Sequence, residues 1–594
     1  MEQNPLLDDR DVDFLLYDVF DVAALTRMPT FADHSRETFD LVLSAARRFA
    51  RGVLFPTYRE LDAIPPVLEN GAVRVHPKMK ELFPKLRDLG LIAAPRSPEV
   101  HGQHLPLVID AVATTYLCAG NLGAASWLIL GRGTGHLVEA FASDALKAEY
   151  LEPLYTGKWT GTMALTEPHA GSSLGDLTTS ATPLDDGSHS IRGSKIFISG
   201  GDHDVTENIV HLVLARIDGA PAGTKGISLF VVPKLRKEGG ALVPNDIAIT
   251  GLIHKIGWRA LPSVAIAFGD HGDCRGWLVG KPNEGLRYMF QMMNEARIGV
   301  GLASTATAHV AYHEALGYAK TRPQGRALGK SGGSQVPIIE HADVRRMLLR
   351  QKAFADASLA LVIATARYAD VAAHGSEEER GRAQRLLDVL TPITKTYPAE
   401  RGFETNVLAL QIFGGYGYSS EYLPEAWLRD QKLNTIHEGT TGIQGLDLLG
   451  RKVMSGGGEA LRLLGEEVAR DVAAAKALSV PGWDDVERAS ERVATVTMAL
   501  GAKGMAGDAA GMMLHSHDYL EMVGTWVFAW MWLKQATVAT KLLATGGAER
   551  ALYEGKLLAA RYFFATELPR TVLWAELCTS GESSYADAAE RHFG

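Results

Sequence analysis

Residues 406–450 read NVLALQIFGGYGYSSEYLPEAWLRDQKLNTIHEGTTGIQGLDLLG. In this stretch a carboxylate, Glu438, follows His437 and precedes Gly439-Thr440. A diglycine turn, Gly414-Gly415, lies upstream, and an amphipathic run follows. A single Glu is normally a solvated surface residue. Its meaning therefore depends on the motifs that accompany it elsewhere in the chain.

The composition is that of an ordinary soluble globular protein with several domains. The chain has 594 residues, more than one hydrophobic core normally supports. Apolar residues make up 46% and charged residues 22% of it. Its formal net charge of −9 argues against a dedicated nucleic-acid binder, which needs a basic surface.

Cysteine usage and hydropathy bear on the compartment. Cys118, Cys274 and Cys578 are far apart and lack metal-ligand spacing, so we expect unpaired thiols in a reducing compartment and no metal site. A membrane-spanning helix needs about eighteen or more uninterrupted apolar residues, and the sequence has no such run. The nearest candidate, Val523–Leu533, is too short. The first residues, MEQNPLLDDRD, are acidic where a signal peptide is basic. We therefore expect a cytoplasmic protein without a membrane span.

The residue patterns predict an α+β multidomain fold. Apolar residues recur at helical spacing in most of the chain. Leu15, Val19 and Val22 predict a short helix in the leader, Phe39, Leu43 and Ala46 form an apolar stripe, and residues 121–128 continue into a helix with little charge that we expect to be buried. Short β-branched runs separated by Gly, Asp and Pro turns predict a β domain or barrel in the middle. The Gly-rich run 455–458 suggests a linker, and the acidic helical stretch beyond it suggests a packing or interaction domain. The expected segments are a leader (1–36), an N-terminal helical domain (37–158), a middle β-barrel domain (159–280), a helical bundle domain (281–454) and a C-terminal helical extension (455–594).

Several sequence blocks occur in a characteristic order. They are MALTEPHAGSS (163–173), KIFISGG (195–201), NEARIGVG (294–301), IFGGYGYSSEY (412–422) and IHEGTTGIQ (436–444). Together they resemble the acyl-CoA dehydrogenase flavoprotein family over roughly residues 36–454. The chain length, the leader and GIQGLDLLGRKV resemble the long subgroup that includes 3-methylmercaptopropionyl-CoA dehydrogenase.

The resemblance implies bound FAD. It also implies that residues of the first two blocks contact the flavin ring: Met163, Leu165, Thr166, Gly171, Ser172, Phe197 and Ser199. Phe197 stands where the family usually has Trp; it can still stack on a ring but donates no N–H. Ser173 stands where the family usually has Asp.

The remaining cofactor and substrate residues also come from the resemblance. Arg322, with Gln324, matches a contact to the flavin diphosphate of a neighbouring subunit, and a guanidinium suits a pyrophosphate. The adenosine-side segment is Gln411, Gly414 and Gly415, also across a dimer interface, and Thr440 bonds the flavin near its diphosphate. We therefore expect at least a homodimer. The implied substrate residues are Ser172, Asn294, Arg297, Glu438 and Gly439. Ala342, Gly445 and Gly450 depart from the family pattern.

Glu438 is the implied catalytic base. A carboxylate in water, with a pKa of about 4.3, is too weak a base for an α proton, but burial raises its pKa. Some family members carry the base on the long helix before the arginine, at the position of Ala296, which cannot ionise. Neighbouring Glu295 is rotated by about 100° and should point away.

The predicted reaction is α,β-dehydrogenation of an acyl-CoA thioester to the trans-2-enoyl-CoA, with hydride passing to the flavin. An electron-transfer flavoprotein is the expected acceptor. One alternative is an acyl-CoA oxidase, which reoxidises with oxygen. Another is a DNA-binding family member of the alkylation response, which the acidic composition disfavours. The sequence leaves the acyl chain open.

Overall fold

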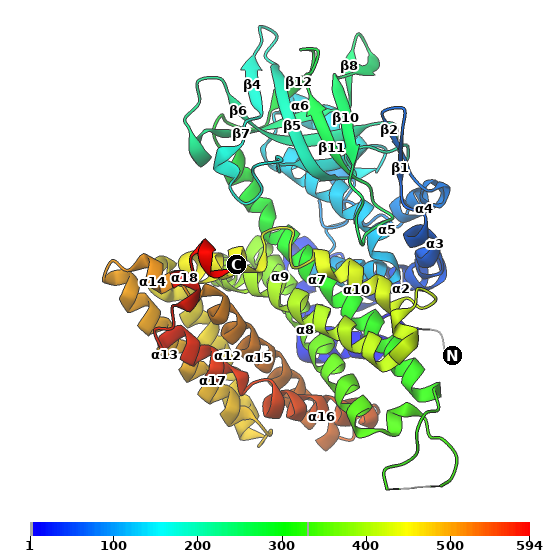
Figure 1. The fold of residues 1–594 in the computed structure, drawn as a ribbon, viewed down its shortest axis with the longest axis vertical. Helices are drawn as coiled ribbons and strands as arrows, with labels where there is room; N and C mark the ends of the chain where they lie inside the picture. The colour runs from blue at the N-terminus through cyan, green and yellow to red at the C-terminus, as the bar shows by residue number, and fades with distance from the viewer. Residues whose placement is uncertain (1–3, 330–331) are drawn as a thin grey trace. The chain divides into compact units, whose positions relative to one another are not determined.

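The computed structural model describes residues 4–329 and 332–594, which fall into two compact units. One unit is Glu37–Ala296, and the other combines Met1–Arg36 with Arg297–Gly594. Figure 1 labels their helices and strands. Helical, β and helical regions follow one another along the chain, so the predicted α+β class is confirmed.

The unit Glu37–Ala296 begins with helices. They are α2 (Arg36–Phe49), α3 (Tyr58–Ala63), α4 (Pro77–Arg87), α5 (Leu107–Phe141) and α6 (Asp144–Tyr155), with a hairpin of β1 (Val67–Glu69) and β2 (Ala72–Arg74). The expected stripe Phe39, Leu43 and Ala46 is buried on α2. Helix α5 is buried along most of its length, as its lack of charge predicted, and it has a kink at Asn121.

The β region of this unit follows α6. Its strands are β3 (Thr160–Ala164), β4 (Ser180–Pro183), β5 (His189–Ser199), β6 (Ile209–Ile217), β7 (Ile227–Pro233), β8 (Leu235–Glu238), β9 (Ala241–Pro244), β10 (Ile247–Leu252), β11 (Ser263–Phe268) and β12 (Arg275–Leu278). The main sheet has the order β10-β11-β5-β12-β7-β6-β3, and β4 pairs with both β5 and β6. Strands β5, β12, β7, β6 and β4 therefore close a ring, the barrel that the sequence predicted.

In the other unit the leader differs from the single short helix that its pattern predicted. It consists of α1 (Asp9–Asp13), a π-helical turn (Phe14–Val19) and, after a left-handed Asp21, a 3₁₀ helix (Val22–Arg27). The wider π turn changes the side-chain spacing. Leu15 and Val22 are buried as expected, but Val19 is only half-buried.

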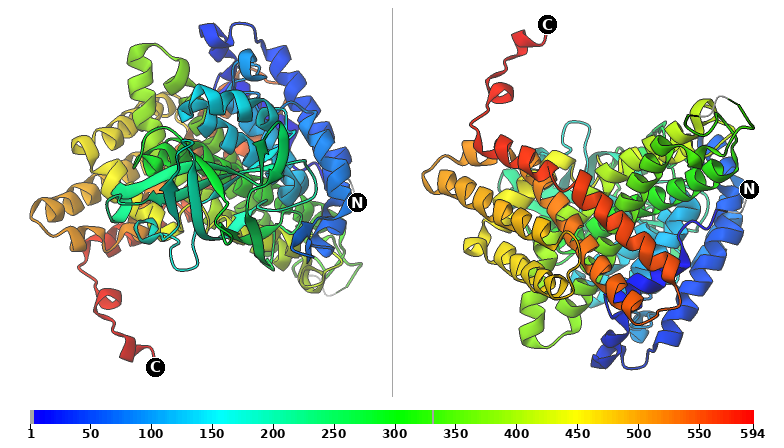
Figure 2. Two further views of the ribbon diagram at one scale, coloured as in Figure 1. Left: turned by 90° about the horizontal axis from the view of Figure 1, so that it is seen from above. Right: turned by 90° about the horizontal axis from the view of Figure 1, so that it is seen from below.

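The rest of this unit is helical. Its helices are α7 (Gly285–Thr321, from Arg297 on), α8 (Ala342–His374), α9 (Glu377–Phe413), α10 (Pro424–Leu433), α11 (Thr441–Asp447), α12 (Glu459–Ala477), α13 (Trp483–Met505), α14 (Ala509–Met513), α15 (Ser516–Ala544), α16 (Arg550–Thr566), α17 (Arg570–Thr579) and α18 (Ser584–Asp587). The expected linker is a tight turn in which Gly456, Gly457 and Gly458 have positive φ, and α12 starts directly after it. Figure 2 shows the C-terminal segment, in red, projecting from the other helices of this unit.

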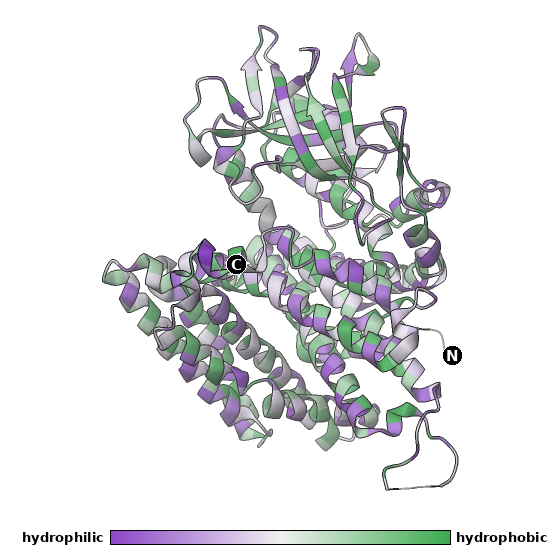
Figure 3. Cartoon of the chain, viewed as in Figure 1, coloured by the Kyte–Doolittle hydropathy of each residue, from purple (hydrophilic) through white to green (hydrophobic). Residues whose placement is uncertain are grey.

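Helix α15 is the core of the C-terminal extension. It carries the apolar run Val523–Leu533, and packs against α8, α9, α12, α13, α16 and α17. The indole N–H groups of Trp526, Trp530 and Trp532 donate to Ser490, Asp471 and the Ala353 carbonyl. Among the described residues no helix is long and apolar enough to cross a membrane, and Figure 3 shows hydrophilic residues along the helices of this unit.

Candidate active site

Glu438 lies in the loop between α10 and α11, whose position is fixed by hydrogen bonds at both ends. Gln431, near the end of α10, donates from Nε2 to the Ala399 carbonyl of α9 (2.7 Å). At the other end, Gln444 Nε2 of α11 donates to the carbonyl of Glu438 itself (2.9 Å). The Thr440 side chain caps the start of α11 by accepting from the Ile443 N–H. The loop is therefore held by α9, α10 and α11 together.

The backbone at Glu438 is unusual for a residue with a side chain. Its φ is +54°, in the left-handed region, and Gly439 follows with a φ of +88°. Non-glycine residues in this region cost free energy and cluster at functional sites. The side chain remains accessible to solvent, yet the protein around the carboxylate desolvates it and raises its pKa, while Lys395 and Arg297 oppose that shift.

The charges around Glu438 come from several helices of the same unit. Lys395 of α9 is completely buried. Arg297 of α7 is 6% exposed and forms an ion pair with Asp447 of α11 (2.6 Å). Glu400 of α9 accepts a hydrogen bond from the Thr441 hydroxyl. The resemblance implies Arg297 as a substrate residue; in the structure its guanidinium is buried and paired with Asp447.

Glu295, the local competitor for the base, belongs to the other unit, as does Asn294. Its carboxylate lies 2.9 Å from His136 Nδ1 and 3.9 Å from the Arg96 guanidinium. Burial alone would raise the pKa of Glu295, but His136 and the neighbouring arginines lower it to about 2. A carboxylate in this setting is a weak base, which favours Glu438.

The residues expected at the cofactor diphosphate and adenosine come together at the ends of α7 and α9. The Arg322 guanidinium lies over the Tyr416 ring, 5.5 Å from its centroid, directly after the Gly414-Gly415 turn. Tyr318 stacks on Phe413 at 4.0 Å and so joins the two helix ends. Gln411 and Gln324 are exposed beside them, and the Gln324 carbonyl accepts from His341 (2.7 Å).

The residues expected at the flavin ring lie on neighbouring segments of the other unit. Met163 is on β3, Leu165 and Thr166 follow it, and Gly171 and Ser172 form an exposed bend. The Thr166 carbonyl accepts from the Ile196 N–H of β5 (2.9 Å), which places that segment beside Phe197 and Ser199. Phe197 has a φ of +60° and is 61% exposed.

A buried ion pair supports these two segments. Lys195 Nζ of β5 contacts Glu167 Oε1 (2.8 Å) and donates to the Leu165 carbonyl (3.0 Å). Glu167 also accepts from the hydroxyls of Thr178 and Thr179. The sequence did not identify this pair, or Lys395 and Asp447, as residues that support the site. The available signal was a lysine or carboxylate inside an otherwise apolar run, as at Lys395 in VLTPITKTYP.

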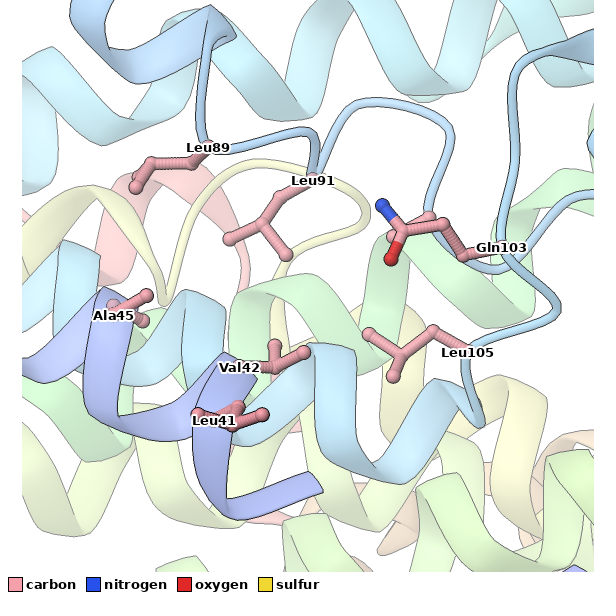
Figure 4. Close-up of a pocket in the computed structure, with 9 residues that line it drawn as sticks. Leu41, Val42, Ala45, Leu89, Leu91, Gln103 and Leu105 are labelled. Atoms are coloured by element: carbon pink, nitrogen blue, oxygen red, sulfur yellow. The ribbon is translucent and has the colours of Figure 1, made fainter. Parts of the chain in front are cut away.

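The unit Glu37–Ala296 also contains an apolar cavity of about 220 Å³. Figure 4 shows Leu41, Val42, Leu89, Leu91 and Leu105 around it, with the Gln103 amide at its edge. None of the residues expected at the flavin ring lines this cavity.

Comparison with known families gives matches along most of the chain. Residues 36–158, 162–270 and 283–454 match the models described as the N-terminal, middle and C-terminal domains of acyl-CoA dehydrogenase. Residues 464–589 match the model described as acetyl-CoA dehydrogenase C-terminal like. The order of these matches is the order of the helical, β and helical regions.

Individual relatives extend over nearly the whole chain. The 3-methylmercaptopropionyl-CoA dehydrogenase of Ruegeria pomeroyi is 38% identical over 93% of this chain and 94% of its own. A broad-specificity linear acyl-CoA dehydrogenase of Mycobacterium tuberculosis is 31% identical over 98% and 99%.

Among solved structures, an acyl-CoA dehydrogenase of Bacillus anthracis complexed with FAD shares 21% identity and a TM-score of 0.74, covering 97% of this chain and 93% of its own. ACDH-11 of Caenorhabditis elegans, in complex with C11-CoA, shares 18% identity and a TM-score of 0.76, covering 97% and 96%. At these identities the structures show the same fold.

Proposed function

The chain belongs to the acyl-CoA dehydrogenase family, and from that premise we propose that it oxidises an acyl-CoA thioester to the trans-2-enoyl-CoA with Glu438 as the base. The observation that carries the proposal is the setting of Glu438. A carboxylate with a raised pKa lies on a left-handed backbone beside a glycine, open to solvent and held by three helices.

Glu438 has one chemical task in this reaction. It accepts the proton from the carbon next to the thioester carbonyl, and a raised pKa makes it a stronger base for that step. The enolate that develops needs hydrogen-bond donors at the carbonyl oxygen. By resemblance to the family, we propose the backbone N–H of Glu438 as one of these donors.

FAD is the cofactor that we propose, and it supplies the acceptor for the hydride from the β carbon. The residues of each unit suit their parts of it. Phe197 exposes a large aromatic ring at the end of β5, and a Cβ at Gly171 would meet no atom within 4 Å. Gly414 and Gly415 are similarly open, next to the Arg322 guanidinium. Open glycines beside an arginine suit a diphosphate and the close approach of a planar ligand.

Two protein partners are proposed from the family resemblance. An electron-transfer flavoprotein would reoxidise the flavin, and a second copy of the chain would share the cofactor through Arg322 and Gln411. Sedimentation should give a flavin-loaded dimer or larger assembly; a flavin-loaded monomer would exclude the shared site. The cytoplasm stays our expectation for its location, with the three cysteines free and buried.

The test is bleaching of the oxidised flavin without oxygen. Purified protein is mixed with a panel that includes 3-methylmercaptopropionyl-CoA, butyryl-CoA and longer linear acyl-CoAs. At least one should reduce the flavin within the mixing experiment, and the pattern gives the acyl preference. Absence of bleaching with every thioester would refute the proposal.

A second arm separates the alternatives. Reduced enzyme is exposed either to oxygen or to an electron-transfer flavoprotein. Rapid hydrogen peroxide release favours an oxidase, and preferential transfer to the flavoprotein favours the dehydrogenase. A salt-dependent shift of duplex DNA would revive the DNA-binding alternative.

A further inference from the structure

Lys395 is a buried cation without a hydrogen bond. Its side chain is completely buried in α9, and Nζ has no hydrogen-bond partner in the described part of the chain. The preceding residue, Thr394, bonds Thr365 of α8 (2.7 Å), and the Thr394 carbonyl lies 2.4 Å from where a Cβ on Gly301 of α7 would be. Lys395 is therefore enclosed where α7, α8 and α9 meet.

The other two buried lysines of the described residues have close partners. Lys556 of the same unit contacts Asp356 (2.8 Å) and Asp11 (3.1 Å), and Lys195 contacts Glu167 (2.8 Å). An isolated buried ammonium group is costly, so such groups are normally paired. Lys395 is the exception among the buried lysines of the described residues, because no carboxylate lies within ion-pair distance of its Nζ.

Lys395 interacts electrostatically with several charged groups of the same unit. Burial lowers the pKa of Lys395 to about 8, which leaves the amine mainly charged at neutral pH. Glu400 of α9 and then Glu438 of the α10–α11 loop favour its charged form, and Arg297 of α7 opposes it. His437 of the same loop is neutral, because burial and then Lys395 lower its pKa to about 3. Beyond these, Asp447 of α11 pairs with Arg297, and His517 of α15 interacts with Glu400.

The two cations near Glu438, Arg297 and Lys395, differ in how closely a carboxylate balances their charge. The charge of Arg297 is largely balanced by Asp447 at 2.6 Å. Glu400 favours the charged form of Lys395 but forms no ion pair with it, and its carboxylate accepts from the Thr441 hydroxyl. Lys395 is thus the cation whose field reaches Glu438 without a closely paired carboxylate.

We propose that Lys395 is a positioning residue for proton transfer, whose buried ammonium charge keeps Glu438 ionised and ready to accept the substrate proton. This proposal rests on the assignment of Glu438 as the base. Desolvation favours the protonated carboxyl, which cannot act as a base; a nearby positive charge favours the carboxylate. The lysine limits how far the pKa of Glu438 can rise.

The experiment compares the flavin-loaded wild type with Lys395→Met and Lys395→Gln, which remove the charge at similar length, and with Lys395→Arg, which keeps it. Two readouts are measured against pH. One is the single-turnover rate of flavin reduction by the best acyl-CoA. The other is the infrared carbonyl band of the protonated carboxyl group, assigned to Glu438 by its loss in Glu438→Gln.

Removal of the charge should raise the pH midpoint in both readouts by about one unit or more, the usual effect of a neighbouring opposite charge. Lys395→Arg should keep the wild-type midpoint. The matched control is Lys556→Met, which also removes a buried ammonium group from this unit; it should lower the melting temperature and leave the midpoint unchanged.

Unchanged midpoints in folded, flavin-loaded Lys395→Met and Lys395→Gln would overturn the proposal. So would an equal shift in Lys556→Met, since the effect would then be general. If no acyl-CoA reduces the wild-type flavin, the proposed function fails, but the infrared titration still shows whether Lys395 controls the ionisation of Glu438.

Discussion

Glu438 and Glu295 are carboxylates with opposite surroundings. Desolvation raises the pKa of Glu438, whereas His136 and the neighbouring arginines lower that of Glu295 to about 2. Glu438→Gln keeps the shape but cannot accept a proton. We expect flavin reduction to fall by about 10² to 10⁴-fold, the usual worth of a positioned base, with acyl-CoA binding retained. Single-turnover absorbance and equilibrium titration measure the two effects.

Glu295→Gln is the matched variant. It should leave flavin reduction within a few-fold of wild type, while loss of the His136 contact lowers the melting temperature. The base assignment is wrong if Glu295→Gln abolishes reduction and Glu438→Gln retains it.

At the scale of elements, the close approach of α7 and α9 positions both Arg297 and Lys395. It depends on Gly301, because a Cβ there would lie 2.4 Å from the Thr394 carbonyl oxygen. Gly301→Ala must therefore push the helices apart. We expect a loss of about 1–3 kcal/mol in the free energy of unfolding, as for other overpacked interiors, together with slower flavin reduction. Urea unfolding and single-turnover kinetics measure these changes.

Gly317→Ala, on the same helix, is the control. A Cβ at Gly317 meets no atom within 4 Å, so alanine should stabilise the helix by about 0.5–1 kcal/mol. Equal stability of the two variants would show that the contact at Gly301 yields without cost.

The elements themselves were largely predictable from the sequence, because burial repeats with the period of a helix or strand. The stripe of α2, the buried α5 and the β region all follow from it. The contacts that complete the site do not. Arg297 and Asp447 are 150 positions apart in the sequence, so no local pattern predicts their ion pair. The burial of Lys395 depends on the packing of three helices, which no local pattern predicts either. The π turn after α1 was also missed, because the apolar residues at positions 15, 19 and 22 fit the period of an α-helix.

At the scale of its unit, the leader and the C-terminal extension are joined by a buried charge cluster. Asp11 of α1 contacts Lys352 of α8 and Lys556 of α16, both at 3.1 Å, and Asp356 contacts the same two lysines. The extension, expected only as a packing or interaction domain, thus shares a core with the first residues of the chain. A chain ending at residue 454 would lose α15 and expose the faces of α8 and α9 that it covers.

This cluster makes stability depend on pH. Burial would raise the pKa of Asp11, but Lys352 and Lys556 lower it well below its usual range. The unfolded chain then takes up a proton first as the pH falls, so the stabilisation is complete above the ordinary Asp pKa of about 3.9 and is lost below it. Asp11→Asn should cost about 3–5 kcal/mol at pH 7, the usual cost of breaking a buried ion pair. The cost should shrink by pH 3, as urea unfolding at both pH values would show.

Asp33→Asn, at an exposed position of the same leader, is the control, and its free energy of unfolding should stay within about 0.5 kcal/mol of wild type at both pH values. A cost for Asp11→Asn that is equal at the two pH values would mean that packing, not charge, holds the leader to α16.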